Sequence, residues 1–153
     1  MVAAAELASL RDPKATPELV KLLADADPSV RYWAALGLFM RGQAAVEAGG
    51  SVLKDALTDK SPVVRVQAAH CLAQFGQGEA AKQGLATLVE LAHAGRNDLF
   101  TAMDALNALD QLGDKAAAQA AAIRDLPERG PAPAARYAEY LPRLVMDLQK
   151  RFQ

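Results

Sequence analysis

Asp27-Pro-Ser-Val-Arg-Tyr-Trp-Ala-Ala-Leu-Gly-Leu38 recurs 34 residues later as Ser61-Pro-Val-Val-Arg-Val-Gln-Ala-Ala-His-Cys-Leu72. Both stretches carry a proline at their second position, a Val-Arg pair and an Ala-Ala pair. Proline suits the first turn of a helix. The valine, the first alanine and the last leucine recur every four residues, which predicts one buried helix face. A motif that returns at a fixed period predicts stacked copies of one structural unit.

Each copy is interpreted as a pair of helices joined by a short turn. A weaker third copy has Leu99 at the position of the proline and Ala102 at that of the arginine. A hairpin cannot bury its apolar face alone, so neighbouring hairpins are expected to stack. The expected units are hairpins at about 16–42, 50–76 and 84–113, and a half repeat at 115–127.

The segments around these hairpins are interpreted as caps and a linker. A short helix over Ala3–Leu10 is expected to cover the first hairpin, and the repeat domain is expected to span residues 1–129. Residues 130–136 are rich in proline and alanine, which indicates a linker. Residues 137–153 are expected to form a C-terminal capping helix. The predicted fold class is therefore all-α, an α-α superhelix of about three helical hairpins with capping helices.

Composition narrows the function classes. The chain has 153 residues, 17 basic and 18 acidic side chains and a formal net charge of −1. It lacks the basic stripe of a nucleic-acid-binding protein, and no apolar run reaches the roughly 20 residues of a membrane span. The start of the sequence does not look like a signal peptide. We therefore expect a soluble chain that binds neither nucleic acid nor a membrane.

The Asp-Pro-x-Val-Arg-x-x-Ala-Ala-x-x-Leu string resembles the short HEAT-like repeat, which is also similar to the repeat of bilin lyases and bacterial scaffold proteins. The Trp-Leu-Gly-Tyr and Thr-Pro-Leu-His patterns of other repeats with a similar period are missing. A wider resemblance rests on Ala4–Asp12, Val30–Leu38 and Ala105–Asp110. These segments, and above all Arg31-Tyr32-Trp33, look like the helical C-terminal region of bacterial sulfatases.

That resemblance places the sulfatase catalytic domain upstream and outside this chain. Sulfatases use a Cys or Ser in a Cys/Ser-x-Pro-x-Arg string, but Cys71 is followed by Leu-Ala-Gln-Phe. No sulfatase active-site residue carries over. If the parent protein is an exported sulfatase, a periplasmic or secreted location follows.

The candidate reactive side chains are interpreted as structural. His70 and Cys71 are adjacent, and neighbouring residues on a helix point about 100° apart, so they would not face each other. His70 and His93 lack metal-ligand spacing. We expect no catalytic, cofactor-binding or metal site.

Arg31 and Arg65 hold equivalent places in the two main copies. One interpretation is a structural ladder of charge bridges to Asp25 and Asp59 at the turns. The alternative is an anion-binding ladder.

Four large side chains of the first hairpin predict a contact surface: Tyr32, Trp33, Leu36 and Phe39. Later copies carry polar residues in place of Trp33 and Leu36, which suggests that the first hairpin meets something that the others do not. Alternatively, Leu7 and Leu10 of the N-terminal helix cover these side chains.

The expected function is a non-catalytic accessory or interaction domain with a protein partner, the C-terminal part of a sulfatase-like hydrolase. The first alternative is a free-standing HEAT-like scaffold that binds a protein. The second is an enzyme such as a bilin lyase, for which the sequence offers no chromophore contacts.

Overall fold

The computed structural model describes residues 2–137 and 139–153, and this part of the chain contains helices, turns and no strand. The predicted all-α fold class is confirmed. Met1 and Ala138, which the sequence assigns to capping segments, lie outside the described residues. The α-helices are α1 (Val2–Ser9), α2 (Thr16–Leu22), α3 (Pro28–Arg41), α4 (Gln43–Ala48), α5 (Gly50–Asp55), α6 (Pro62–Phe75), α7 (Gly78–Ala92), α8 (Leu99–Leu112), α9 (Ala120–Arg124) and α10 (Tyr140–Arg151). Short 3₁₀ turns are η1 (Pro13–Ala15), η2 (Ala56–Thr58), η3 (Gly113–Gln119) and η4 (Ala135–Tyr137).

The chain divides within α7 into two compact units. Unit 1 ends at Gly84, and unit 2 begins at Leu85. Each unit has its own buried core, and each is described by itself.

The helix starts of unit 1 follow from its turn residues. Pro28 is the first residue of α3, and the Asp27 carboxylate accepts the amide of Ser29 at 2.8 Å. Pro62 opens α6 in the same way, but there Asp59 accepts the amide of Ser61 at 2.7 Å. Such side-chain acceptors satisfy amides that have no partner within the helix.

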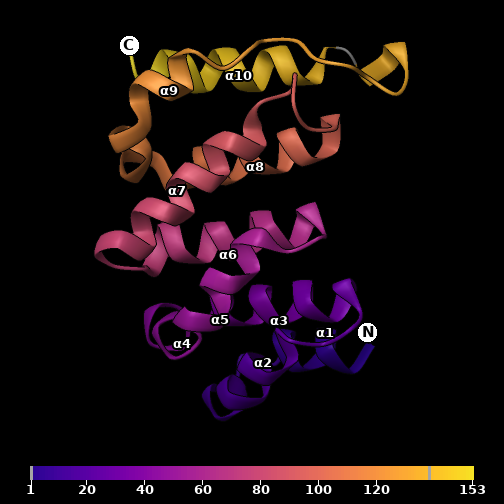
Figure 1. The fold of residues 1–153 in the computed structure, drawn as a ribbon, viewed down its shortest axis with the longest axis vertical. Coiled ribbons are helices and arrows are strands. Elements are labelled where there is room, and N and C mark those ends of the chain that lie inside the picture. Colours follow the sequence, from indigo (N-terminus) through magenta and orange to yellow (C-terminus); the bar gives the residue numbers. More distant parts are fainter. Residues whose placement is uncertain (1, 138) are drawn as a thin grey trace. The chain divides into compact units, whose positions relative to one another are not determined.

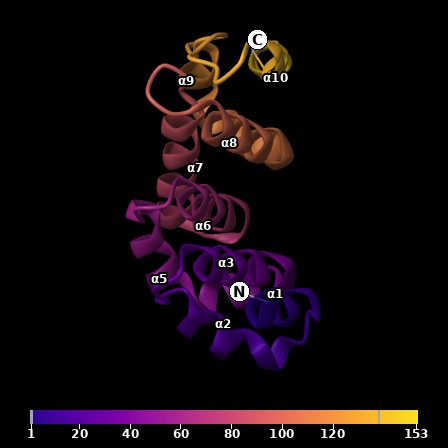
Figure 2. The ribbon, with the colours of Figure 1, turned by 90° about the vertical axis from the view of Figure 1, so that its right-hand side faces the viewer.

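The helices of unit 1 form two layers (Figures 1 and 2). α3 and α6 lie side by side in one layer, and α2 and α5 lie in the other. The equivalent residues Val30 and Val64 are both buried, as are Ala34 and Ala68. The predicted alanine-lined core is therefore present in this unit.

The N-terminal helix α1 lies along α3, on the side away from α6. Gly37 makes this packing close, because a Cβ there would lie 3.1 Å from the Ala8 Cβ. The Arg41 guanidinium donates to the Leu7 carbonyl at 2.7 Å and to the Ala8 carbonyl at 3.1 Å. Since the last carbonyls of a helix have no internal partner, Arg41 both caps α1 and fixes it to α3.

In unit 2, α10 packs on α8 and α9. The Arg124 guanidinium donates to the Phe152 carbonyl at 2.7 Å, and the Gln149 amide donates to the Arg124 carbonyl at 2.9 Å. Arg151 lies 2.9 Å from the Asp110 carboxylate. The end of the chain is thus held by hydrogen bonds as well as by buried apolar side chains of α10.

The helices depart from the sequence prediction in three places. Residues 115–126, expected as one helix, form η3 and the short α9; within η3 only Ala116 is buried, so little packing holds a regular helix. The last helix begins at Tyr140, with Pro142 in the first turn, where no internal amide donor is needed. Helix α4, which lies between the first two predicted hairpins, was not predicted.

Candidate interaction surface

The four side chains of the predicted contact surface all project from α3, and each is half-buried. The rings of Tyr32 and Trp33 meet edge to face with centroids 5.8 Å apart. Phe39 instead packs between α3 and α6, with its ring centroid 4.5 Å from that of His70 and 5.4 Å from that of Phe75. Phe39 is therefore part of the helix packing, whereas Tyr32, Trp33 and Leu36 form the accessible α3 face.

Of the two α1 residues that the alternative interpretation names, Leu7 is half-buried and Leu10 is largely exposed. Leu10 is 75% exposed, and the buried side chains of α1 are Ala4 and Ala8. Small side chains let α1 approach α3 closely but cover little of the neighbouring surface. The α3 face keeps an apolar area that solvent reaches.

Arg31 joins two successive turns of unit 1. Its Nε lies 2.7 Å from Asp59 Oδ2, its Nη2 lies 2.8 Å from Oδ1, and its Nη1 donates to the Asp25 carbonyl at 2.8 Å. The two-pronged hydrogen bond raises the pKa of Arg31 and lowers the pKa of Asp59. The pair is only 15% and 10% exposed, so its geometry is that of a structural bridge.

The other two residues of the expected ladder make local contacts. Arg65 donates from Nε to the Leu57 carbonyl at 2.9 Å, within its own hairpin. The Asp25 carboxylate accepts the amide of Asp27 at 2.8 Å, as Asp59 does for Ser61. Asp25 and Asp59 are thus equivalent as turn residues. They differ in that the Asp59 carboxylate also accepts hydrogen bonds from the Arg31 guanidinium.

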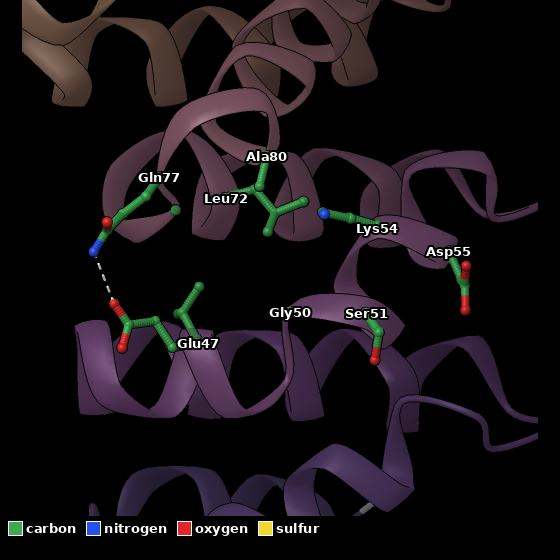
Figure 3. Close-up of a pocket in the computed structure, with 10 residues that line it drawn as sticks. Glu47, Gly50, Ser51, Lys54, Asp55, Leu72, Gln77 and Ala80 are labelled. Atoms are coloured by element: carbon green, nitrogen blue, oxygen red, sulfur yellow. Dashed lines mark hydrogen bonds between the residues drawn. The ribbon is translucent and has the colours of Figure 1, made fainter.

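A groove that the sequence did not predict opens between α4–α5 and the α6–α7 turn of unit 1 (Figure 3). Its volume is about 520 Å³. The floor is apolar and the rim is polar, and the lining residues are Val46, Glu47, Gly50, Ser51, Lys54, Asp55, Leu72, Gly76, Gln77 and Ala80. An apolar floor within a polar rim is the usual form of a binding pocket.

The walls of the groove are set by two features of the chain. At one end the Gln77 amide donates to the Glu47 carboxylate at 3.0 Å and joins the two walls (Figure 3). Gly50 lies on the wall, and a Cβ there would meet no atom within 4 Å. The groove exists because the chain breaks into α4 and α5 after α3, and a 34-residue sequence period gives no signal for that break.

His70 and Cys71 lie buried on α6 and show no sign of reactivity. Burial raises the pKa of the Cys71 thiol to about 12, and the thiol contacts the Ala35 carbonyl at 3.3 Å. Burial also lowers the pKa of His70 to about 4, so its imidazole is neutral beside Phe39. A protonated thiol is a poor nucleophile.

His93 lies in unit 2, where its Nδ1 accepts the Gly95 amide at 3.2 Å. Among residues 2–137 and 139–153, no group of three or more His, Cys, Asp or Glu side chains is placed to hold a metal ion. The described helices include none with the length and apolarity to cross a bilayer.

Comparison with known proteins bears on unit 1. None of the curated proteins matches this chain. The HEAT repeat family matches residues 50–78, a segment that contains α5, α6 and the start of α7. The predicted HEAT-like character is therefore confirmed for the second hairpin, and the chain carries a HEAT-like repeat domain built from helical hairpins.

Proposed function

We propose that this chain is a non-catalytic accessory domain that docks on a protein through the α3 face. The observation that carries the proposal is that Tyr32, Trp33 and Leu36 stay partly accessible although α1 packs on α3. Aromatic side chains are enriched where proteins bind one another, because they bury a large area at a small entropy cost. HEAT-like hairpins supply the rigid support for such a face.

The proposed partner is the catalytic domain of a sulfatase-like hydrolase. The support is the Arg31-Tyr32-Trp33 string and the accompanying likeness to sulfatase C-terminal regions. In the structure Arg31 points to Asp59, while Trp33 keeps accessible area on α3. The string thus combines a structural residue with Trp33, whose side chain stays partly accessible on α3.

Trp33 offers the direct test, since it is the only tryptophan of the chain. A photo-reactive phenylalanine analogue at position 33 is expected to cross-link the chain to a sulfatase catalytic domain in the cells that produce it. The same analogue at Val63, an exposed position of α6, is the matched control and is expected to give no such product. Equal products from both positions, or none from position 33, would contradict docking through the α3 face. A specific product with another class of protein would overturn the sulfatase partner.

The groove of unit 1 favours a second candidate function, a free-standing scaffold that binds a peptide segment of another protein. An apolar side chain of the peptide would lie on the floor of the groove, which Val46 and Leu72 form. Polar groups of the peptide would meet the charged rim. This candidate differs from the first in the surface that it uses.

Variants at Gly50 test the groove without disturbing the core. Gly50→Leu and Gly50→Ala both remove a helical glycine, but only leucine reaches across the open space. Short phage-displayed peptides selected on the unmodified chain are expected to bind the alanine variant and to lose binding to the leucine variant. Peptides that bind both variants equally, or a selection that enriches none, would rule out the groove as a peptide site.

A further inference from the structure

Three aromatic rings gather on the surface of unit 2. Phe100 near the start of α8 lies 5.6 Å from Tyr137, measured between ring centroids, and Tyr137 lies 6.3 Å from Tyr140. Phe100 and Tyr140 are each 52% exposed. Exposed apolar side chains that lie next to one another often mark a contact surface, whereas single ones do not.

A hollow of about 320 Å³ adjoins this cluster, between the start of α8 and the proline-rich segment. The segment approaches the α7–α8 turn closely at Gly130, where a Cβ would clash with the Ala94 carbonyl oxygen. Prolines fix the backbone of the wall, so the hollow is largely preformed. Its lining residues are Asp98, Leu99, Phe100, Pro131, Ala132 and Pro133.

Two carboxylates of α8 and its N-cap lie near the aromatic cluster, Asp98 and Asp104. A hydrogen bond from the Thr101 hydroxyl holds the pKa of Asp98 below its usual value, so Asp98 is ionised. Asp104 stands four residues after Phe100, on the same face of α8, and its side chain is exposed. Partial burial and then repulsion from Asp98 raise the pKa of Asp104. Among the described residues, no basic side chain forms a salt bridge with Asp104.

Two basic side chains near the cluster, Arg129 and Arg136, already have partners within the chain. Arg129 pairs with Glu139 at 3.4 Å, so the two charges offset each other. Arg136 stacks on Tyr137, with its Cζ 4.7 Å from the ring centroid and its Nη2 2.6 Å from the hydroxyl oxygen. The cluster therefore already holds one guanidinium on an aromatic face, while Phe100 and Tyr140 have exposed ring area without one.

We propose that this aromatic and acidic surface of unit 2 binds an arginine side chain of a partner protein's peptide segment. A guanidinium can stack on Phe100 and donate two hydrogen bonds to the carboxylate of Asp104, which follows one helical turn later on α8. Lysine offers a point charge without the flat face, so arginine fits better. The inference goes beyond the docking of unit 1, and neither depends on the other.

The test uses the full chain, labelled for NMR, with two short capped peptides of sequence Gly-Arg-Gly and Gly-Gln-Gly. The arginine peptide is expected to shift the ring signals of Phe100 and Tyr140 saturably, and the glutamine peptide is not. Asp104→Asn is expected to weaken binding by about fivefold, the loss of a modest charge interaction. Asp147→Asn on the exposed side of α10 is the matched control and should leave binding unchanged.

Equal shifts with both peptides would overturn the proposal, as would equal binding by the Asp104→Asn and Asp147→Asn variants. Both aspartates are exposed, so backbone spectra that match the unmodified chain show that folding is intact. Phe100→Ala is a second variant and should abolish the saturable shift of Tyr140. An arginine-dependent Tyr140 shift that persists in Phe100→Ala would rule out stacking on Phe100 and overturn the proposal.

Discussion

Replacing Gly84 by alanine tests the close contact between α6 and α7 within unit 1. Alanine in a helix interior normally stabilises a protein by about 1 kcal/mol relative to glycine. Here a Cβ would lie 2.6 Å from the Ala69 carbonyl oxygen, 2.7 Å from the Ala73 nitrogen and 2.9 Å from the Leu72 Cβ. These distances are well inside the roughly 3.5 Å at which nonbonded atoms make their best contacts. Two of the three atoms are backbone, so only a movement of the helices relieves the overlap.

The expected result is a net loss of about 2 kcal/mol, because overpacking typically costs about 1–3 kcal/mol and outweighs the helix propensity of alanine. Urea denaturation followed by circular dichroism measures the change. Gly50→Ala is the matched control, since a Cβ there meets open space, and it should leave the stability equal or raise it by up to about 1 kcal/mol. If Gly84→Ala is as stable as the unmodified chain or more so, the close contact of α7 with α6 is refuted.

Three further predictions concern polar side chains within unit 1. Asp59→Ala should lower the free energy of unfolding by about 2–3 kcal/mol, because the largely buried Arg31 guanidinium loses its carboxylate partner. A double-mutant cycle with Arg31→Met should show a coupling energy above about 1 kcal/mol. Additive losses in the cycle would contradict the bridge. His70 is neutral in the folded chain, with a pKa of about 4 against an ordinary value of 6.5, so unfolding takes up a proton between these two pH values. The contribution of His70 to the free energy of unfolding should therefore be fully present above about pH 6.5 and should fall by about 1.4 kcal/mol per pH unit towards pH 4. The His70→Leu variant should lose this pH dependence. A pH dependence that persists in the variant would assign it to another group. Arg41→Met keeps the aliphatic stem but removes the donors to the carbonyls of α1. Amide hydrogen exchange should therefore accelerate in α1 and stay unchanged in α6. Equal protection of the α1 amides before and after the substitution would refute the capping role.

Sequence periodicity predicts the parts of this fold that repeat. The four-residue recurrence of Val30, Ala34 and Leu38 identifies the buried face of α3, and the copy at Val64 and Ala68 does the same for α6. Apolar spacing works here because both helices bury the same face against the same kind of neighbour. The HEAT repeat match at residues 50–78 lies on the second of these copies.

Sequence periodicity does not predict structural features that occur only once in the chain. The groove depends on the break between α4 and α5, which has no counterpart at the 34-residue offset. The aromatic cluster joins Phe100 to Tyr137, which are far apart in sequence, and Gly130 between them lies against Ala94, just after α7. The α3 face was predicted as four residues, but Phe39 is used by the neighbouring helix α6. Which large side chain a neighbour takes up depends on its exact direction, and composition carries no such information.

The equivalent position in successive second helices shows how a repeat can keep its core and change its surface. Trp33 on α3 is half-buried, Gln67 on α6 is buried with its amide 3.8 Å from the Cys71 sulfur, and Asp104 on α8 is exposed. The buried faces beside them remain alanine and leucine. Because the core needs only small and apolar residues at its own positions, this neighbouring position is free to vary in chemistry. One backbone pattern thus places an aromatic ring at this position in unit 1 and a carboxylate in unit 2.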